Sequence, residues 1–421
     1  MRYVVLGGGI ASLSCVKGIR QKDSSSSIFW VSKEKYPPYR RPMITSVLEG
    51  KISLEDILLL DGSPLPHPNV TLMLGQAAEG IDVQNRVLFL QSKERLEYDK
   101  LLIATGAKPK LPPIPGIGLK GIYPFREYEH VNSIMKALPD AKSILIVGAG
   151  AAGIKVATSL VKFNKQVSMV EMTDQVLPNI LDKTASEMMI LRLNQSGINV
   201  ILSDQVVEFE GKEHVTGAIL QNSGRINADI VILTIGVSPA MDFLEGSGIE
   251  YSKGIIVNSF LESNVEGVYA AGDVIQFKEV SSGLTTVTPI WPEAVCQGEI
   301  AGLNMVGSNI SYKGCLRRNV IQVHDTDFLS IGLVEPKRDL QTSISSLDLS
   351  RSGLQKDFYR KIVLEGSRLK GIVMVNNITY GGFFAELIRN QVELEIDIED
   401  LLDPGCEEEI LPRLLCREFR A

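Results

Sequence analysis

Two segments of the chain share one pattern, in which an apolar strand leads through a glycine-rich turn into a helix. The first segment spans residues 3–12 and the second spans residues 143–153. A turn of this kind exposes backbone N–H groups at a helix N-terminus, where the helix dipole favours negative charge, so it can hold a phosphate. A further strand-like run follows each helix, at 28–31 and 166–171. Each segment therefore predicts a βαβ unit that binds a dinucleotide, and the pair predicts two such domains.

The number of glycines present decides how closely each segment matches the dinucleotide-binding pattern. The second turn has all three glycines of the pattern, whereas the first has a serine in the third place. A serine is still small enough for the helix to pass close to the sheet. The turn residues that we expect to surround the phosphates are Gly7, Gly9, Ser12, Gly148, Gly150 and Gly153.

The end of the second strand in such a unit normally contacts a ribose of the nucleotide. In the second unit this position holds Glu171, whose carboxylate can accept hydrogen bonds from a ribose diol and would repel a 2′-phosphate. That site should prefer NADH, with NADPH as the alternative. In the first unit Ser32 and Glu34 are both candidates, because the position favours Ser32 and the charge favours Glu34. The alternative for all three is a side chain that merely faces water.

Five further segments resemble motifs of the FAD-dependent pyridine nucleotide-disulfide oxidoreductases, which contain two dinucleotide-binding domains. Residues 101–107 resemble the family's Ala-Thr-Gly turn, 234–239 its exit from the NAD domain, and 263–273 its second FAD motif. Residues 38–42 and 291–298 resemble segments of one branch, which contains the NADH:rubredoxin and ferredoxin reductases, the NADH oxidases and the flavin portion of nitrite reductase. The resemblance implies that the following residues contact the cofactors: Arg41, Pro42, Ala104, Thr105, Gly106, Gly236, Gly272, Asp273 and Trp291.

The resemblance also implies roles for two of these residues. Asp273 would bond the ribityl chain of FAD. The helix that begins at Trp291 would point its N-terminus at the pyrimidine edge of the flavin and stabilise negative charge there. Ordinary packing of Trp291 is the alternative.

Two departures from the family pattern bear on the mechanism. Members that reduce peroxide, oxygen or coenzyme A disulfides use a redox cysteine close to the position of Pro42, and this chain has no cysteine between residues 16 and 295. A sulfenic acid or mixed-disulfide mechanism therefore lacks its nucleophile. In the NAD motif the usual glutamate is replaced by Lys155, our candidate catalytic residue. Three roles are open to Lys155: binding a carboxamide oxygen, pairing with an acidic neighbour, or extending into solvent.

We expect an α/β fold with two Rossmann-like domains, the NAD domain being inserted in the FAD domain, and a small α+β domain at the C-terminus. The proline-rich stretch 109–116 marks one boundary, because proline is excluded from helix interiors and central strands. A second boundary follows the apolar strand that ends near Gly236. The expected domains are 1–112 and 241–319 for the two parts of the FAD-binding domain, 113–240 for the NAD(P)H-binding domain and 320–421 for the C-terminal interface domain.

Composition excludes several other classes of protein. A formal net charge of -7 disfavours a nucleic-acid partner. The 5 cysteines are scattered and the 4 histidines lie far apart, which argues against a disulfide scaffold and a metal site. The apolar stretch 143–161 is interrupted by glycines, and the N-terminus lacks a signal region, so we expect a cytoplasmic protein with no membrane partner.

These observations predict an FAD-dependent NAD(P)H oxidoreductase. A hydride would pass from NADH to flavin N5, and electrons would then pass directly to a small electron-transfer protein such as rubredoxin or ferredoxin, or to an iron–sulfur subunit. Two alternatives stay open: an NADH oxidase that reduces oxygen, and a non-catalytic flavoprotein sensor that binds NADH. A homodimer is open as well. We expect the acidic stretch 393–400 to be a solvated face.

Overall fold

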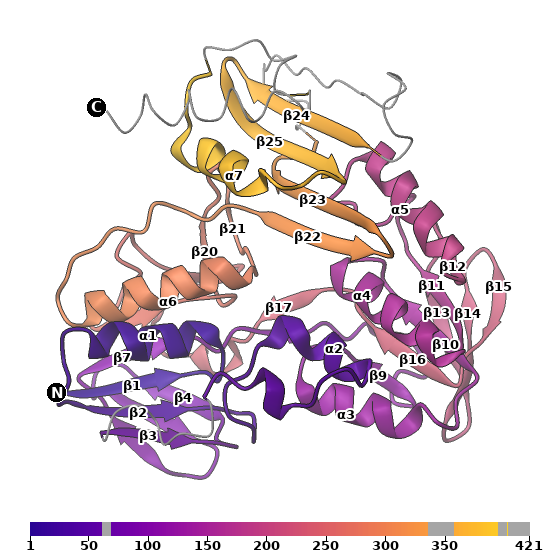
Figure 1. Cartoon of the computed structure of the whole chain (residues 1–421). Helices are drawn as coiled ribbons and strands as arrows, with labels where there is room; N and C mark the ends of the chain where they lie inside the picture. Colours follow the sequence, from indigo (N-terminus) through magenta and orange to yellow (C-terminus); the bar gives the residue numbers. More distant parts are fainter. Residues whose placement is uncertain (61–68, 336–357, 395–401, 403–421) are drawn as a thin grey trace.

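The computed structural model describes residues 1–60, 69–335, 358–394 and 402. Figure 1 shows three parts, with a C-terminal sheet lying above two α/β parts that stand side by side. Each α/β part contains a five-stranded parallel sheet, and the C-terminal sheet is antiparallel. The predicted fold class, with two Rossmann-like domains and a small α+β domain, is confirmed.

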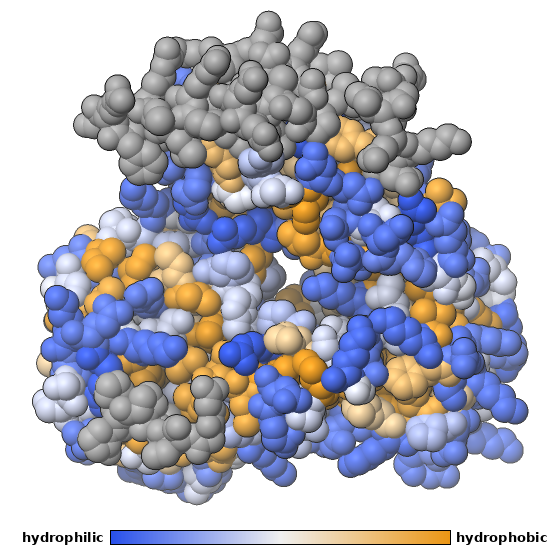
Figure 2. All heavy atoms as spheres, viewed as in Figure 1, coloured by the Kyte–Doolittle hydropathy of each residue, from blue (hydrophilic) through white to orange (hydrophobic). Residues whose placement is uncertain are grey.

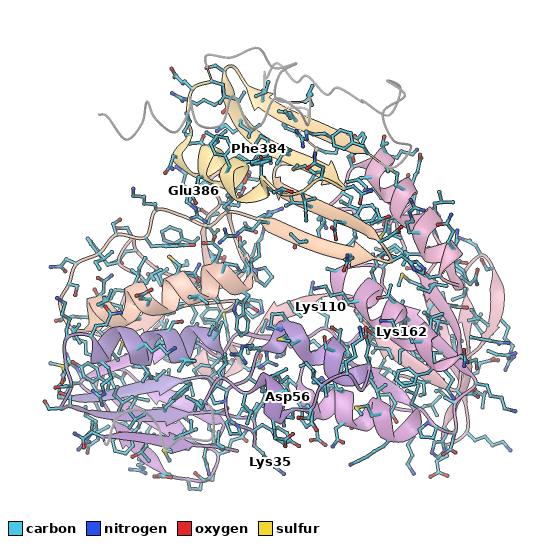
Figure 3. All side chains as sticks on the ribbon, in the orientation of Figure 1. Lys35, Asp56, Lys110, Lys162, Phe384 and Glu386 are labelled. Carbon is cyan, nitrogen blue, oxygen red and sulfur yellow. The ribbon has the colours of Figure 1, made fainter. Side chains whose placement is uncertain are left out.

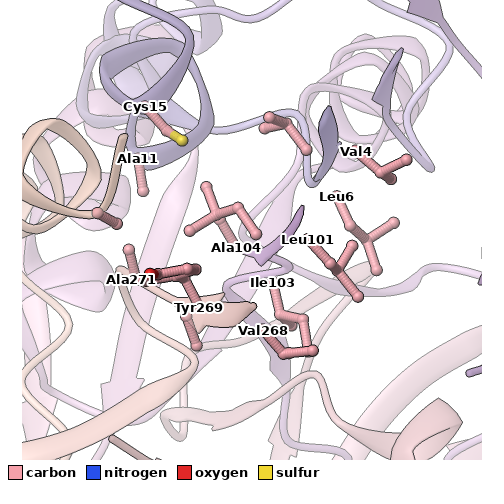
Figure 4. Packing of buried hydrophobic residues seen from close by; sticks show 14 of the residues in the cluster. Val4, Leu6, Ala11, Cys15, Leu101, Ile103, Ala104, Val268, Tyr269 and Ala271 are labelled. Carbon is pink, nitrogen blue, oxygen red and sulfur yellow. The ribbon is translucent and has the colours of Figure 1, made fainter. Parts of the chain in front are cut away.

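The first parallel sheet contains the strands of the first dinucleotide-binding unit. Its strands, in order across the sheet, are β19 (Val268–Ala270), β7 (Lys100–Ile103), β1 (Arg2–Leu6), β2 (Ser27–Val31) and β3 (Val70–Met73). β1 and β7 are almost entirely buried, as expected for strands with both faces covered. Figure 4 shows Leu6, Leu101 and Val268 packing together in this core.

Two helices far apart in sequence lie against each other on this sheet. They are α1 (Ile10–Arg20) and α6 (Trp291–Met305), which lie side by side in Figure 1. Their backbones come into contact at glycines of α6: a Cβ atom on Gly298 would lie 2.2 Å from the carbonyl oxygen of Ala11, and one on Gly302 would lie 2.3 Å from that of Cys15. This close packing holds the start of α6 near the glycine turn that precedes α1.

The second parallel sheet belongs to the second unit. Its strands, in order, are β12 (Ile198–Ile201), β11 (Gln166–Val170), β10 (Ser143–Val147), β16 (Ile230–Leu233) and β9 (Ile122–Pro124). The helices of this part are α3 (Tyr128–Ala137), α4 (Ala151–Leu160) and α5 (Lys183–Gln195). The apolar stretch 143–161 thus forms β10 and α4. Across the described residues, no helix combines the length and apolarity that a membrane span requires.

The chain crosses between the two parallel sheets twice, and the crossings pair with each other. β8 (Ala107–Pro109) forms an antiparallel ribbon with β17 (Val237–Pro239). Lys110, labelled in Figure 3 between the two parts, extends this pairing by donating its backbone N–H to the carbonyl of Gly236 at 3.1 Å. The ribbon adjoins the expected boundaries at residues 112 and 240; these boundaries, and the one at 319, stay predictions.

Smaller elements, which the sequence did not predict, complete the two α/β parts. Two antiparallel sheets consist of β4 (Ala78–Asp82), β5 (Val87–Leu90) and β6 (Arg95–Glu97), and of β13 (Val206–Gly211), β14 (Val215–Leu220) and β15 (Gly224–Asn227). The short elements are α2 (Ile44–Leu48), β18 (Ile255–Ile256), β20 (Ile275–Lys278), β21 (Thr285–Thr286) and the 3-10 turns Arg41–Met43, Glu55–Ile57, Val161–Phe163 and Asp242–Leu244.

The C-terminal part is a four-stranded sheet with one helix on it. The strands, in order, are β22 (Arg318–Val323), β23 (Thr326–Gly332), β25 (Arg368–Val375) and β24 (Tyr359–Glu365), and the helix is α7 (Gly381–Asn390). The Tyr359 hydroxyl donates a hydrogen bond to the carboxylate of Asp182, the residue before α5, so this part is also tied to the second unit. Most of the acidic stretch 393–400 lies outside the described residues.

Candidate functional site

A cavity of about 570 Å³ lies where the first glycine turn, the start of α6 and the start of α4 meet. On the face drawn in Figure 2, the molecule is hollowed where its three parts come together. The predicted residues that line the cavity are Gly7, Gly9, Ser32, Glu34, Arg41, Pro42, Ala104, Thr105, Gly106, Lys155, Gly272, Asp273 and Trp291. Those that do not line it are Ser12, Gly148, Gly150, Gly153, Glu171 and Gly236.

The first glycine turn presents bare backbone to this cavity. Gly7 has φ +132°, and a Cβ atom there would lie 2.0 Å from the carbonyl oxygen of Ala104. At Gly8 a Cβ atom would lie 2.2 Å from the hydroxyl of Ser32, whereas Gly9 has open space beside it. A side chain at Gly7 would not fit against the carbonyl of Ala104, and one at Gly8 would have to displace the hydroxyl of Ser32. Bare backbone at the start of α1 therefore lines the cavity, an arrangement suited to a pyrophosphate.

Two buried serine hydroxyls near the turn lack hydrogen-bond partners. Oγ of Ser12 and Oγ of Ser32 are both buried without a partner in the described part of the chain. Ser32 lines the cavity, and Ser12 lies beneath the turn, close to Gly7. A buried hydroxyl that makes no hydrogen bond is costly. The Ser32 hydroxyl could therefore form a hydrogen bond with a hydroxyl group of a ligand, such as the ribose of a dinucleotide.

Glu34, the other ribose candidate, is engaged by protein side chains. Its Oε2 accepts a hydrogen bond from the Tyr39 hydroxyl at 2.6 Å, and its Oε1 pairs with Nη2 of Arg41 at 2.5 Å. Arg41 also donates from Nη1 to the carbonyl of Arg126 at 3.0 Å. Burial raises the pKa of Tyr39, so its hydroxyl stays a donor. Glu34 thus orients Arg41 at the cavity wall. Ser32 is the better ribose candidate, because its hydroxyl has no hydrogen-bond partner among the described residues.

Asp273 has a partner that sequence reasoning missed. Its Oδ2 accepts a hydrogen bond from Nη2 of Arg126 at 2.8 Å. Arg126 lines the cavity and follows β9, the strand after the crossing into the second part. No motif surrounds Arg126 in the sequence, so only the fold could reveal this contact. Thr105 is fixed at the same crossing, because its hydroxyl donates to the carbonyl of Ala240 at 2.8 Å.

The second glycine turn is equally tight. Gly148 has φ +102°, and a Cβ atom there would lie 2.8 Å from the carbonyl oxygen of Thr234. A Cβ atom on Gly153 would lie 2.1 Å from the carbonyl oxygen of Gly148, so α4 passes directly over the turn. Gly150 has open space beside it. The turn therefore has the close packing that the three-glycine pattern predicts.

Glu171 lies against this second turn. Its Oε2 accepts a hydrogen bond from the backbone N–H of Ala149 at 2.8 Å. Its Oε1 accepts two bonds of 3.0 Å from Thr173, one from the backbone and one from the hydroxyl. Thr173 was not singled out in the sequence. The carboxylate is thereby fixed at the strand end, next to the turn, where the pattern predicts a ribose contact.

These features were compared with known proteins. The family model of the pyridine nucleotide-disulphide oxidoreductases matches residues 1–298. The chain belongs to this family. Its members are NAD(P)H-dependent flavin oxidoreductases, so this chain is an enzyme of an FAD- and NAD-binding flavoprotein family. The predicted resemblance is confirmed, since its relatives include rubredoxin and ferredoxin reductases, an NADH oxidase and a nitrite reductase.

Three relatives and one structure illustrate the range of the similarity. The "NADH-dependent phenylglyoxylate dehydrogenase subunit epsilon" of Aromatoleum evansii is 28% identical over 93% of this chain and 92% of its own length. The "NADH oxidase" of Methanocaldococcus jannaschii is 31% identical over 79% of this chain and 76% of its own. The "Assimilatory nitrate reductase electron transfer subunit" of Bacillus subtilis is 26% identical over 96% of this chain, which spans only 51% of that relative. A covalent putidaredoxin reductase–putidaredoxin complex shares the fold, with a TM-score of 0.87, 21% identity and coverage of 99% of this chain and 98% of that one.

Lys155 is where this member departs from the family pattern. It lines the cavity from α4, together with Ala151 and Ala152. Its ammonium group has no hydrogen bond or ion pair with any residue that the structure describes, and burial lowers its pKa. Among the described residues, pairing with an acidic neighbour is therefore not observed. Other charged groups of the cavity wall do form pairs: Arg41 with Glu34, Arg126 with Asp273 and Lys108 with Asp242.

The cysteines that the structure describes are not part of the cavity wall. Of the described cysteines, Cys15 and Cys315 are buried, Cys296 is half-buried, and none lines the cavity. Burial raises the pKa of all three thiols, to about 11 for Cys315. A thiol with a raised pKa is a poor nucleophile. Cys406 and Cys416 lie outside the described residues.

Proposed function

We propose that this chain is an FAD-dependent NADH oxidoreductase that passes electrons from the flavin directly to a small redox protein or an iron–sulfur partner. The observation that carries the proposal is the shared cavity, in which the first glycine turn and the start of α4 face the same space. A hydride can transfer only when donor and acceptor atoms lie about 3–3.5 Å apart. A single space that both dinucleotide-binding units reach would allow the two reacting rings to approach that closely.

FAD fits the residues of the first unit. The turn at Gly7 and Gly9 would hold the pyrophosphate, and the unpartnered hydroxyl of Ser32 would bond a ribose. Asp273, held by Arg126, would bond the ribityl chain, and the α6 N-terminus at Trp291 would face the flavin. When bound, FAD accepts a hydride from a reduced nicotinamide and can release its electrons one at a time.

NADH fits the second unit. The turn that contains Gly148, Gly150 and Gly153 would hold its pyrophosphate, and Glu171 would bond the ribose diol and disfavour the 2′-phosphate of NADPH. The nicotinamide would then enter the shared cavity beside Lys155. Lys155 would bind the carboxamide oxygen there, since it has no acidic partner among the described residues. A requirement for NADH also supports the cytoplasmic location that we predict.

The electron acceptor is inferred from what the cavity wall contains. Its described residues include no thiol, so none of the described cysteines is placed to relay electrons. A relative that matches this chain over nearly its full length is named as a subunit of an NADH-dependent dehydrogenase. Others are named as rubredoxin and ferredoxin reductases. These names support a protein acceptor, either a separate small carrier or an iron–sulfur subunit of the same complex.

An NADH oxidase is the second candidate. It is favoured by the relative of that name, which is 31% identical to this chain. The same cavity would serve, with oxygen in place of the protein acceptor. The rate at which the reduced protein reoxidises in air separates the two candidates.

The deciding experiment is an anaerobic titration of the FAD-loaded protein with NADH, followed in the visible flavin band. Rapid bleaching, with slow recovery in air and fast recovery on adding rubredoxin or ferredoxin, is the result expected. Fast recovery in air would favour the oxidase. A flavin that stays oxidised would reject the proposal and favour a sensor that binds NADH without turnover.

A further inference from the structure

A buried carboxylate lies in the first turn of α6, beside the cavity. Glu293 is 1% exposed, and its neighbours Trp291 and Ala294 line the cavity. Oε2 of Glu293 accepts a hydrogen bond from the Tyr312 hydroxyl at 2.5 Å, and Oε1 accepts one from Nη2 of Arg389 at 2.8 Å. Nη2 of Arg318 lies farther away, 3.9 Å from the same Oε1. Burying a charge without a partner is very costly, so Glu293 depends mainly on the two short hydrogen bonds.

Arg389 comes from a different part of the molecule. It belongs to α7, the helix of the C-terminal domain, which also carries Phe384 and Glu386 (Figure 3). Burial alone would lower the pKa of Arg389, but the hydrogen bond and charge of Glu293 outweigh it and raise the pKa. The guanidinium therefore stays charged and supplies the nearer counter-ion for a carboxylate in α6.

The hydrogen bonds continue from Glu293 to the cavity wall. The Tyr312 hydroxyl accepts from Nε2 of Gln297 at 3.1 Å, and Oε1 of Gln297 accepts from the backbone N–H of Gly272 at 2.8 Å. Gly272 lines the cavity and directly precedes Asp273. Burial raises the pKa of Tyr312, so this hydroxyl keeps its proton and can donate to Glu293 while it accepts from Gln297.

These hydrogen bonds form a relay that runs from Arg389 through Glu293, Tyr312 and Gln297 to the backbone of Gly272. The side chains of Glu293, Gln297 and Tyr312 are all buried. Connected buried networks of this kind fix the positions of their members. The relay therefore joins α7 of the C-terminal domain to the turn at Gly272. It also determines how much negative charge the first turn of α6 presents to the cavity.

We propose that Glu293, Tyr312 and Arg389 are positioning residues of the flavin site, through which the C-terminal domain sets the electrostatics of the bound flavin. Arg389 neutralises Glu293. The hydrogen bonds through Tyr312 and Gln297 link the position of this ion pair to the position of the turn at Gly272. The inference rests on the proposed function, because it requires FAD in the cavity.

The sign of the effect follows from the charges. A negative charge near a group that takes up electrons makes that group harder to reduce. Removing Arg389 leaves Glu293 with only the longer ion pair to Arg318, so the midpoint potential of the bound FAD should become more negative. Removing the charge of Glu293 leaves Arg389 in excess, so the potential should become more positive.

The experiment measures the midpoint potential of bound FAD by reductive titration with dithionite, together with FAD affinity. The variants are Arg389→Met, Arg389→Lys, Glu293→Gln and the double variant of Arg389→Met with Glu293→Gln. The matched control is Arg368→Met, which breaks an exposed ion pair with Glu393 in the same domain. We expect Arg389→Met to shift the potential to more negative values and to weaken FAD binding about tenfold, the size of one lost charged hydrogen bond.

The double variant separates an electrostatic role from a structural one. The double variant should return close to the wild-type potential, because it removes the positive charge of Arg389 and the negative charge of Glu293 together. Arg389→Lys, which keeps the charge, should restore most of the wild-type potential, and Arg368→Met should match the wild type. An unchanged potential in Arg389→Met, or a double variant whose potential stays as negative as that of Arg389→Met alone, would overturn the inference.

Tyr312→Phe tests the same relay if Arg389→Met fails to fold. It removes one hydroxyl without changing a charge, so FAD should bind more weakly, and unchanged affinity would count against the relay. Dithionite reduces flavin without NADH, so a failed NADH half-reaction leaves this test intact. Conversely, wild-type protein that retains no FAD would reject the proposed function itself.

Discussion

Arg126 and Asp273 are joined by a hydrogen bond of 2.8 Å between Nη2 and Oδ2, although they come from different parts of the fold. Arg126 follows the first crossing into the second part, and Asp273 ends the last FAD motif of the first part. Both side chains are largely buried, with exposed fractions of 16% and 19%. The orientation of Asp273 at the cavity therefore depends on the path of the connecting chain.

Replacing either partner should weaken FAD binding. Arg126→Met removes a hydrogen bond to a charged group, worth about 1.5–3 kcal/mol, so FAD affinity should fall about tenfold or more. Asp273→Ala should lose at least as much, because it removes the group proposed to bond the ribityl chain. FAD release, followed by flavin fluorescence, measures both. Asp273→Ala protein that stays fully yellow would remove Asp273 from the FAD site.

The contact between Arg126 and Asp273 also marks the limit of what the sequence can predict. The two glycine turns and their strands were predictable because each is a local pattern, set by backbone geometry within a few residues. Arg126 and Thr173 have no such pattern. Each reaches the site through the fold, so its role depends on contacts that spacing does not encode.

The same distinction applies to the fold. Strands β1, β2, β10 and β11 were predictable from their apolar runs beside the glycine turns, whereas β3, β9 and β12 were not predicted. The β4–β6 and β13–β15 sheets were missed, because short antiparallel strands, such as the half-exposed β6 and β15, have weak patterns. The choice between Ser32 and Glu34 likewise needed the structure, which engages Glu34 with Arg41 and Tyr39.

Glu171→Gln should change the choice of nicotinamide cofactor. The carboxylate lies against the second glycine turn, where it would repel a 2′-phosphate, and the amide removes that repulsion. We expect the ratio of kcat/KM for NADH over NADPH to fall about tenfold, the scale of one charged hydrogen bond. The control is Glu210→Gln on β13, whose carboxylate pairs with Arg225 on the surface. An unchanged ratio in Glu171→Gln would remove this residue from the ribose site.

Lys155→Met should make the cofactor-free protein more stable, in a pH-dependent way. Burial lowers the folded-state pKa of Lys155, so between that pKa and the ordinary value the unfolded chain binds more protons and stability rises with pH. Lys155→Met should therefore raise the free energy of unfolding most below the folded-state pKa of Lys155. The increase should shrink as the pH rises from that pKa towards the ordinary pKa of lysine. Chemical denaturation at several pH values measures the gain. An advantage that does not change up to strongly alkaline pH would mean that the ammonium is not destabilised by burial.

The same variant tests the nicotinamide contact. If Lys155 binds the carboxamide oxygen, Lys155→Met should raise the KM for NADH while FAD content stays at the wild-type level. Lys162, labelled in Figure 3 and paired with Glu49, gives the control variant Lys162→Met in the following turn. Equal KM values for the wild type and Lys155→Met would mean that Lys155 extends away from the cofactor.

Removing every cysteine should leave electron transfer from NADH to a dye intact. The variant uses alanine at the buried Cys15 and Cys315 and serine at Cys296, Cys406 and Cys416, because a hydroxyl is costlier to bury than a thiol. The described thiols lie away from the cavity, so activity per bound FAD should match the wild type. Loss of that activity with FAD still bound would contradict the direct mechanism.

Replacing a glycine by alanine should have opposite effects on stability in the two helices α6 and α7. Gly302→Ala places a Cβ atom 2.3 Å from the carbonyl oxygen of Cys15 and should force α1 and α6 apart, at a cost of about 1–3 kcal/mol in the free energy of unfolding. Gly382→Ala lies in α7 with open space around it and should stabilise the protein by up to about 1 kcal/mol, because alanine is the better helix former. Denaturant unfolding compares the two.

The pair also tests whether helix packing positions the flavin site. α1 begins at the first glycine turn and α6 begins at the cavity, so spreading them should displace two walls at once. Gly302→Ala should therefore lower FAD affinity as well as stability, whereas Gly382→Ala should leave FAD affinity unchanged. If Gly302→Ala destabilises the fold but retains FAD as tightly as the wild type, the cavity is held by its loops and not by the contact between α1 and α6.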